Sequence, residues 1–169
     1  MKLIQSNLRF KSYGSHTPHT VTLHHTAGGR VGSESYLKQQ GLGYHFMIDK
    51  DGTTHQYNGL DNVVGHSSKA NRGYIGVSYI AGGSLGPVNE IQLQASIELL
   101  KDLHNKYPNI TKVSDHATID KIVAKRGWKS DPQWPGEKSE SNDWKVKRHY
   151  LNLITQQTGL KAVYTNDDL

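Results

Sequence analysis

The chain has 169 residues, of which 34% are hydrophobic and 21% charged, and it carries a net charge of +5, ten histidines and no cysteine. A chain of this length suits one domain and buries enough surface to fold without disulfides or a structural metal. The lack of cysteine excludes disulfide scaffolds, thiolate zinc fingers, iron–sulfur clusters and cysteine nucleophiles. No apolar run approaches the roughly 18 residues of a membrane-spanning helix, and the segment from Met1 to Asn7 turns polar too early for a signal peptide.

The first predicted strand delivers two histidines. Residues 20–23 alternate polar and apolar side chains and lead into His24 and His25, a pattern typical of a strand. Glycines follow, and Ser33 could cap a short helix over residues 33–40.

A hairpin comes next in the sequence. Residues 44–48 and 53–57 are predicted strands, and the Asp51-Gly52 pair between them tolerates the positive φ that a tight hairpin turn needs. Residues 74–80 predict a further strand, closed by two glycines.

The second half of the chain predicts helices around one short strand. Asn89 caps the clearest helix, in which apolar residues recur at helical spacing. A short strand at Val113 leads to His116, residues 117–140 are predicted to form a long loop, and residues 142–157 a final helix. This mixture predicts an α/β fold in which a central mixed sheet is flanked by helices.

Positive charge is concentrated in residues 121–129. This segment has no acidic residue and contains Lys121, Lys125, Arg126 and Lys129. The net charge suits an anionic partner such as an acidic polymer. Because no helix-turn-helix, zinc-finger spacing or aromatic RNA-binding signature accompanies the charge, we expect no nucleic-acid binding. A plain solvated loop is the alternative interpretation.

The histidines divide by their surroundings in the sequence. Those in a polar segment or on predicted helices are expected to be solvated or structural: His16, His19, His104 and His149. Those at strand ends or beside glycine lie where loops present chemical groups: His24, His25, His66 and His116. A catalytic zinc needs about three protein ligands and an open position, and a carboxylate can complete such a set without cysteine. Asp115, Asp120 and Asp131 are close to His116 in sequence, and spacing alone does not choose among them.

Five segments in order resemble the zinc-dependent N-acetylmuramoyl-L-alanine amidases, a family of phage endolysins, bacterial amidases and animal peptidoglycan recognition proteins. The segments are Val21 to Gly28, Gly43 to Ile48 with Asp51 to Thr53, Val64 to Ser67, Tyr74 to Val77, and Ser114 to His116 with Lys129 to Pro132. Each is weak alone, but together they form a strong signal that runs through most of the chain. The resemblance implies the fold of the peptidoglycan amidases and recognition proteins, with a core over residues 18–158.

The resemblance also assigns roles to individual side chains. The implied zinc ligands are His24, His116 and Asp131. Lys129 would stabilise the oxyanion, and Tyr44 would either hydrogen-bond the attacking water or pass a proton to the leaving amine. His66 would contact the substrate at the rim of the cleft.

Two neighbouring positions, 25 and 78, have no assigned role in the site. His25 has the opposite strand parity from His24, so we expect it to point to the other face and leave it out of the metal site. Ser78 stands where some relatives have a glutamate that acts as general base. This departure favours the subgroup that uses a tyrosine and a lysine.

The activity implied by the resemblance is hydrolysis of the amide between N-acetylmuramic acid and L-alanine in peptidoglycan, with one zinc ion per chain. The leading interpretation is a phage-type endolysin with a single catalytic domain over residues 1–169 and no separate cell-wall-binding domain. The alternatives are a cytoplasmic recycling amidase that acts on anhydromuropeptides, and a non-catalytic peptidoglycan-binding protein of the same fold.

The expected partner is the peptidoglycan substrate. We expect a monomer without a membrane anchor that stays in the host cytoplasm until it is released to the cell wall. The basic segment 121–129 would then form a wall of the cleft that faces an anionic stem peptide.

Overall fold

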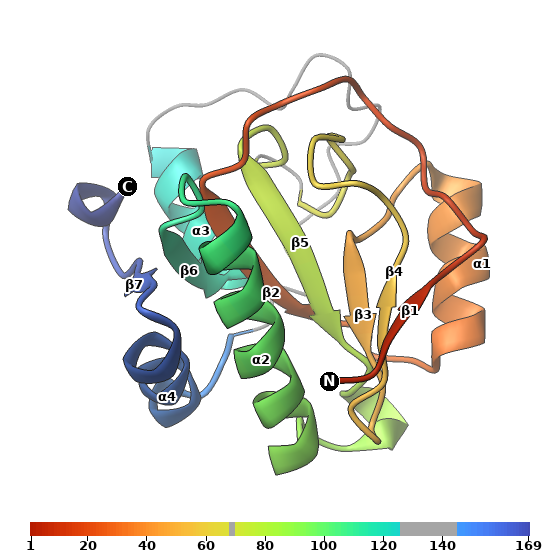
Figure 1. Ribbon diagram of the computed structural model, residues 1–169. Coiled ribbons are helices and arrows are strands. Elements are labelled where there is room, and N and C mark those ends of the chain that lie inside the picture. The colour runs from red at the N-terminus through yellow and green to blue at the C-terminus, as the bar shows by residue number, and fades with distance from the viewer. Residues whose placement is uncertain (68–69, 126–144) are drawn as a thin grey trace.

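A seven-stranded sheet organises the computed structural model, which describes residues 1–67, 70–125 and 145–169 (Figure 1). In chain order the strands are β1 (Leu3–Gln5), β2 (Thr20–His25), β3 (Phe46–Ile48), β4 (Thr54–Gln56), β5 (Tyr74–Tyr79), β6 (Lys112–Asp115) and β7 (Lys161–Ala162). The helices are α1 (Arg30–Gln40), α2 (Glu90–Lys106), α3 (His116–Lys125) and α4 (Arg148–Thr158), with short 3₁₀ turns η1 (Gly83–Leu85) and η2 (Asn166–Asp168). Among the helices of the described residues, none is long and apolar enough to cross a membrane.

The sheet is mixed, as predicted, and its order is β1-β4-β3-β5-β2-β6-β7. β2 pairs in parallel with both β5 and β6, whereas β3 and β4 form an antiparallel hairpin. In this register Leu23 lies opposite both Val77 and Asp115. The carboxyl ends of the three central strands therefore meet at one edge of the sheet, where parallel α/β sheets commonly bind ligands.

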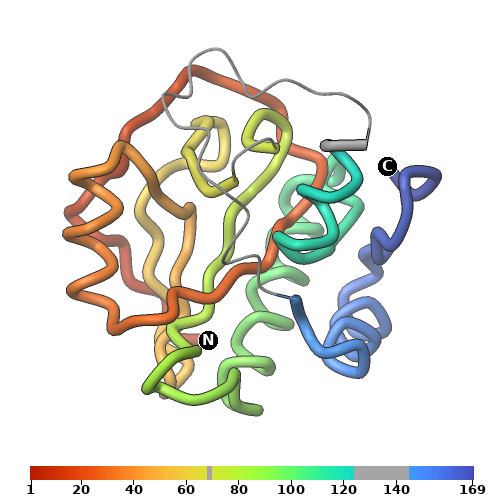
Figure 2. The backbone as a smooth tube through the Cα atoms, turned by 180° about the vertical axis from the view of Figure 1, so that it is seen from behind, coloured from red at the N-terminus to blue at the C-terminus, as the bar shows by residue number. Residues whose placement is uncertain are grey.

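Helices cover both faces of the sheet. On one face, α2 and α4 pack on the main apolar core, which contains Val21, Leu23, Ile75 and Val77 (Figure 1). On the other face, α1 contributes Leu37 to a second apolar cluster, and α3 contributes Ile119, Ile122 and Val123 to a third (Figure 2). His24, His66 and His116 belong to neither of these smaller clusters, and their rings lie close together.

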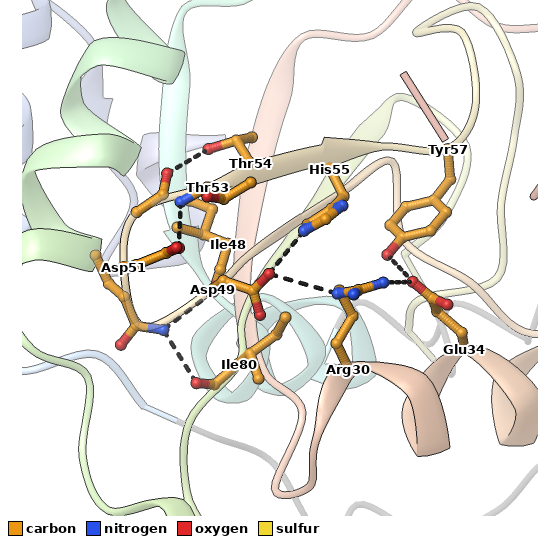
Figure 3. A network of polar contacts seen from close by, with 12 residues as sticks. Arg30, Glu34, Ile48, Asp49, Asp51, Thr53, Thr54, His55, Tyr57 and Ile80 are labelled. Carbon is orange, nitrogen blue, oxygen red and sulfur yellow. Dashed lines mark hydrogen bonds and ion pairs between the residues drawn. The ribbon is translucent and has the colours of Figure 1, made fainter. Parts of the chain in front are cut away.

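A polar network joins α1 to the β3–β4 hairpin (Figure 3). Arg30 contacts Glu34 at 2.9 Å and Asp49 at 3.4 Å, and Asp49 also contacts His55 at 2.7 Å. The Tyr57 hydroxyl donates to Glu34 at 2.7 Å. These mutual contacts hold the helix that follows His24 against the hairpin that follows Tyr44.

The predicted hairpin and the α2 cap are confirmed. Gly52 adopts a φ of 86°, and its N–H donates to the Asp49 carbonyl at 2.8 Å. The Asn89 side chain accepts from the N–H of Gln92 while the Gln92 side chain accepts from the N–H of Asn89. Both features are set by residues that are neighbours in sequence, so they could be anticipated.

Three boundary predictions were wrong. The first helix begins at Arg30 with Gly29 as its cap, and Ser33 lies within the helix instead of capping it. Residues 117–125 belong to α3 instead of a loop, while residues 126–140 of that predicted loop lie outside the described residues. The final helix begins at Arg148, later than position 142. The edge strands β1 and β7 were not predicted.

Candidate active site

Four of the predicted site residues lie together at the carboxyl edge of the sheet. The His24 ring centroid is 4.6 Å from that of His116, 5.1 Å from that of His66 and 5.0 Å from that of Tyr44. The four side chains come from the end of β2, the start of α3, the segment before β5 and the segment before β3. The other two predicted site residues, Lys129 and Asp131, lie outside the described residues.

Strand alternation directs His24 toward this site. Val21 and Leu23 point into the main core, so His24 and Thr22 point to the opposite face. His24 is only 2% exposed and pairs in register with Ser78 of β5. His25 has the other parity, and its ring packs against Gly82.

His116 is placed by the junction between a strand and a helix. β6 ends at Asp115 and α3 begins at the next residue. One Asp115 carboxylate oxygen accepts from the N–H of Thr118 at 2.8 Å, and the other accepts from the N–H of Val146 at 2.9 Å. Asp115 thus caps α3 and fixes the direction in which the helix leaves the sheet.

A second side chain contacts Nε2 of each of these two histidines. His24 Nε2 lies 3.1 Å from His66 Nδ1, and His66 Nε2 lies 3.4 Å from the carbonyl oxygen of Tyr74. His116 Nε2 lies 2.7 Å from Asp120 Oδ2, one helical turn further along α3. The Ser67 hydroxyl donates to the other oxygen of Asp120. Two of the three carboxylates close to His116 in sequence therefore have structural partners.

Burial sets the protonation of this site. Burial lowers the pKa of His24 well below its usual value, and the nearby His116 and His66 act in the same direction. The pKa of His66 is likewise lowered well below its usual value, chiefly by burial. Burial raises the pKa of Tyr44 to about 12, against a smaller opposing effect from the Ser78 side chain. At neutral pH His24 and His66 are thus neutral imidazoles, the form that binds metals, and Tyr44 is a protonated phenol that can donate a hydrogen bond.

The donor set suits zinc as far as it is described. His24 and His116 have ring centroids 4.6 Å apart, close enough to share one ion, and Nε2 of each contacts another side chain. Within residues 1–67, 70–125 and 145–169, no group of three or more His, Asp or Glu side chains could hold a metal.

The partner role of Asp120 was missed at the sequence level. It depends on Asp120 lying four residues after His116 on one helix, and that segment was predicted as a loop. The spacing of apolar residues at 119, 122 and 123 was the available signal, since it matches a helical face.

Comparisons with solved structures find the same fold in cell-wall amidases and recognition proteins. The N-acetylmuramoyl-L-alanine amidase LysC from Clostridium intestinale is 24% identical, with a TM-score of 0.64 over 95% of this chain and 99% of that chain. The Ph2119 endolysin of the Thermus scotoductus bacteriophage Ph2119 is 18% identical, with a TM-score of 0.56 over 93% and 99%. PGRP-SA of Apis mellifera is 17% identical, with a TM-score of 0.55 over 69% and 85%.

Sequence comparison identifies the family. Among curated protein sequences, none matches the chain significantly. The sequence profile described as N-acetylmuramoyl-L-alanine amidase matches residues 14–134, which include the segments that carry His24, Tyr44, His66 and His116. Because this match spans well over half of the chain, the protein belongs to the N-acetylmuramoyl-L-alanine amidase family.

Proposed function

We propose that the chain is a zinc-dependent, endolysin-type enzyme that hydrolyses the amide between the lactyl group of N-acetylmuramic acid and the L-alanine of the stem peptide. The observation that carries the proposal is the pairing of His24 and His116, whose ring centroids lie 4.6 Å apart and whose Nε2 atoms both have other partners. Asp131 is the proposed third ligand. Zinc held there would supply a Lewis acid for activating water and polarising the amide carbonyl.

Tyr44 is the proposed proton-handling group of the reaction. Its ring lies 5.0 Å from that of His24, and its raised pKa keeps the hydroxyl protonated at neutral pH. The hydroxyl can donate a hydrogen bond to the attacking water or deliver a proton to the leaving amine. Lys129 is proposed to stabilise the oxyanion of the tetrahedral intermediate as a fixed cation beside it.

The residue at position 78 supports this assignment of roles. Ser78 is fully buried next to His24, and a serine there offers no carboxylate to act as a general base. Catalysis in this chain therefore depends on Tyr44 and Lys129. The substrate contact expected of His66 stays a prediction, since this residue is 7% exposed and its ring nitrogens contact His24 and Tyr74.

The endolysin assignment is supported by two features. The structural relatives include a bacteriophage endolysin that aligns over 93% of this chain, and the net charge of +5 suits an anionic cell wall. We propose that the protein acts as a monomer and resides in the host cytoplasm until it reaches the wall.

Mass spectrometry of digested peptidoglycan tests this function directly. We expect stem peptides with free L-alanine amino termini, loss of this cleavage after treatment with EDTA, and its recovery with zinc. Intact sacculi and soluble anhydromuropeptides are compared as substrates, and faster cleavage of sacculi is expected of an endolysin. Preference for the soluble fragments would indicate a recycling amidase, and binding to sacculi without cleavage would indicate a recognition protein.

The third ligand is tested by Asp131→Ala. We expect this variant to lose stoichiometric zinc, measured by elemental analysis, while circular dichroism shows an unchanged fold. Asp131→His is the matched variant, because a histidine can replace a carboxylate as a zinc ligand. Normal zinc content in Asp131→Ala would move the third ligand to another residue.

A further inference from the structure

We propose that His66 and Asp120 are positioning residues that fix the tautomers of His24 and His116, so that both ligands present Nδ1 to the metal. This inference rests on the proposed zinc site and goes beyond it, because neither residue is assigned as a ligand. Metal-binding histidines commonly use their second ring nitrogen to hydrogen-bond a carboxylate, a carbonyl or another fixed group.

The positions of the hydrogens on His24 and His66 follow from the last acceptor in this series of contacts, the Tyr74 carbonyl oxygen. The Tyr74 carbonyl oxygen can only accept, so the His66 nitrogen that faces it, Nε2, carries the hydrogen. A neutral His66 then has its lone pair on Nδ1, and His24 must donate to it from Nε2 across 3.1 Å. A neutral His24 consequently has its lone pair on Nδ1. If Nδ1 of His66 carried the hydrogen instead, the lone pair on its Nε2 would face the lone pairs of the Tyr74 carbonyl oxygen.

The His116 side reaches the same result with a carboxylate. Asp120 is 3% exposed, and its Oδ2 lies 2.7 Å from His116 Nε2. This contact occupies Nε2 of His116, so Nδ1 is the nitrogen proposed to face the metal. In both pairs, His66–His24 and Asp120–His116, the nitrogen proposed to face the metal is therefore Nδ1.

One segment holds both positioning residues in place. Asn71 Oδ1 accepts from the backbone N–H groups of His66 and Ser67 at 3.0 and 2.9 Å, and its Nδ2 donates to the Ser67 carbonyl at 2.8 Å. The Ser67 hydroxyl donates to Asp120. His66 contacts His24 directly, and the adjacent Ser67 contacts His116 through Asp120. The same segment therefore holds both pairs.

The position of the His66 ring is further restricted by β5. A Cβ built on Gly76 would lie only 2.7 Å from His66 Cγ, so the ring packs directly against the bare backbone of this strand. A side chain at position 76 would displace the ring from His24. The absence of a side chain at Gly76 is thus part of the arrangement.

The test compares His66→Leu with His66→Asn. Leucine removes the acceptor, whereas Oδ1 of asparagine can stand close to the position of Nδ1 and accept from His24. We expect His66→Leu to weaken zinc binding by about 10–100-fold in a competition titration with a chelating dye, and His66→Asn to recover most of the loss. Asp120→Ala is expected to weaken zinc binding within the same range.

His16→Leu is the matched control for the histidine variants. Like His66, His16 bonds through both ring nitrogens, to the Leu60 carbonyl and the Gly73 N–H, but its ring does not contact His24. We expect its zinc affinity to equal that of the wild type at the same degree of folding, which thermal unfolding reports. This control separates positioning from a general loss of stability.

A second measurement reads the tautomers in the metal-free protein. Long-range ¹H–¹⁵N spectra should show the hydrogen of His24 on Nε2 in the wild type and a mixture of tautomers in His66→Leu. An Nδ1–H tautomer of His24 in the wild type, or wild-type zinc affinity in folded His66→Leu, would overturn the proposal. Zinc binding that follows these variants without cleavage of peptidoglycan would instead refute only the proposed enzyme function.

Discussion

The two faces of strands β2 and β5 have opposite compositions, although they share one backbone. One face presents Val21, Leu23, Ile75 and Val77 to the main core under α2. The other presents Thr22, His24, Gly76 and Ser78 to the candidate site. The apolar face is buried in the main core, whereas on the polar face His24 contacts His66 of the segment before β5 and packs against the ring of His116 of α3. Residues that stabilise the fold therefore alternate along each strand with residues of the candidate site. A substitution on one face should change either the free energy of unfolding or the zinc binding and activity.

His24→Ala on the polar face is expected to have the largest effect on zinc binding and activity while leaving the fold unchanged. Removing this proposed ligand should abolish stoichiometric zinc binding and reduce amide hydrolysis to the background rate, because the remaining donors would not hold the ion in place. Elemental analysis and release of L-alanine amino termini measure the two effects, and circular dichroism checks the fold. Full zinc content with normal activity would show that this face does not carry the chemistry.

In the core against the apolar face, Leu100→Ala in α2 should lower stability without changing zinc binding. Leu100 is completely buried in the main core, and truncating a buried leucine lowers the free energy of unfolding by about 2–5 kcal/mol. Urea denaturation measures this loss. The zinc content per folded molecule should stay at the wild-type value, and a fall in parallel with stability would mean that the two faces are not independent.

Acid should weaken the polar side of the molecule first. His45 is fully buried, it bonds to the Asn62 carbonyl and the Gly76 N–H, and burial lowers its pKa to about 4. Because its pKa in the unfolded chain is about 6.5, the unfolded chain binds the proton first, and stability falls as the pH drops from about 6.5 toward 4. The loss from His45 alone should be roughly 2–3 kcal/mol, since each unit of pKa shift corresponds to about 1.4 kcal/mol.

Urea denaturation of the metal-free protein at pH 7.5, 6 and 4.5 measures this dependence. His45→Gln removes the titrating group and should flatten the profile, although other buried histidines will leave some slope. A wild-type stability that stays constant from pH 7.5 to 4.5 would contradict the assignment of a neutral, buried His45.

Features set by neighbouring residues could be predicted from sequence, and features set by distant contacts could not. The Asp51-Gly52 turn and the strand that ends at His24 were predicted because local residues define them. Helix α3 was missed because β-branched residues such as Ile119 and Val123 favour helices weakly. The cap at Asp115 and the packing of α3 against Tyr74 stabilise the helix despite this weak propensity.

The same division applies to the candidate site. Strand ends and the family resemblance were enough to single out His24, His116, Tyr44 and His66, which the structure brings together. The links from Ser67 to Asp120 and from His66 to Tyr74 were not predictable. They depend on how the segment before β5 lies against α3, which no local pattern in the sequence encodes.

The direct passage from β6 into α3 has a consequence for the kinetics of metal loading. His116 is the first residue of the helix and follows the last residue of the strand without a connecting loop. Its backbone is thus preorganised by two regular elements before any ion arrives, and little conformational entropy remains to be lost on binding. Binding of the proposed zinc should then require little rearrangement of the backbone at His116.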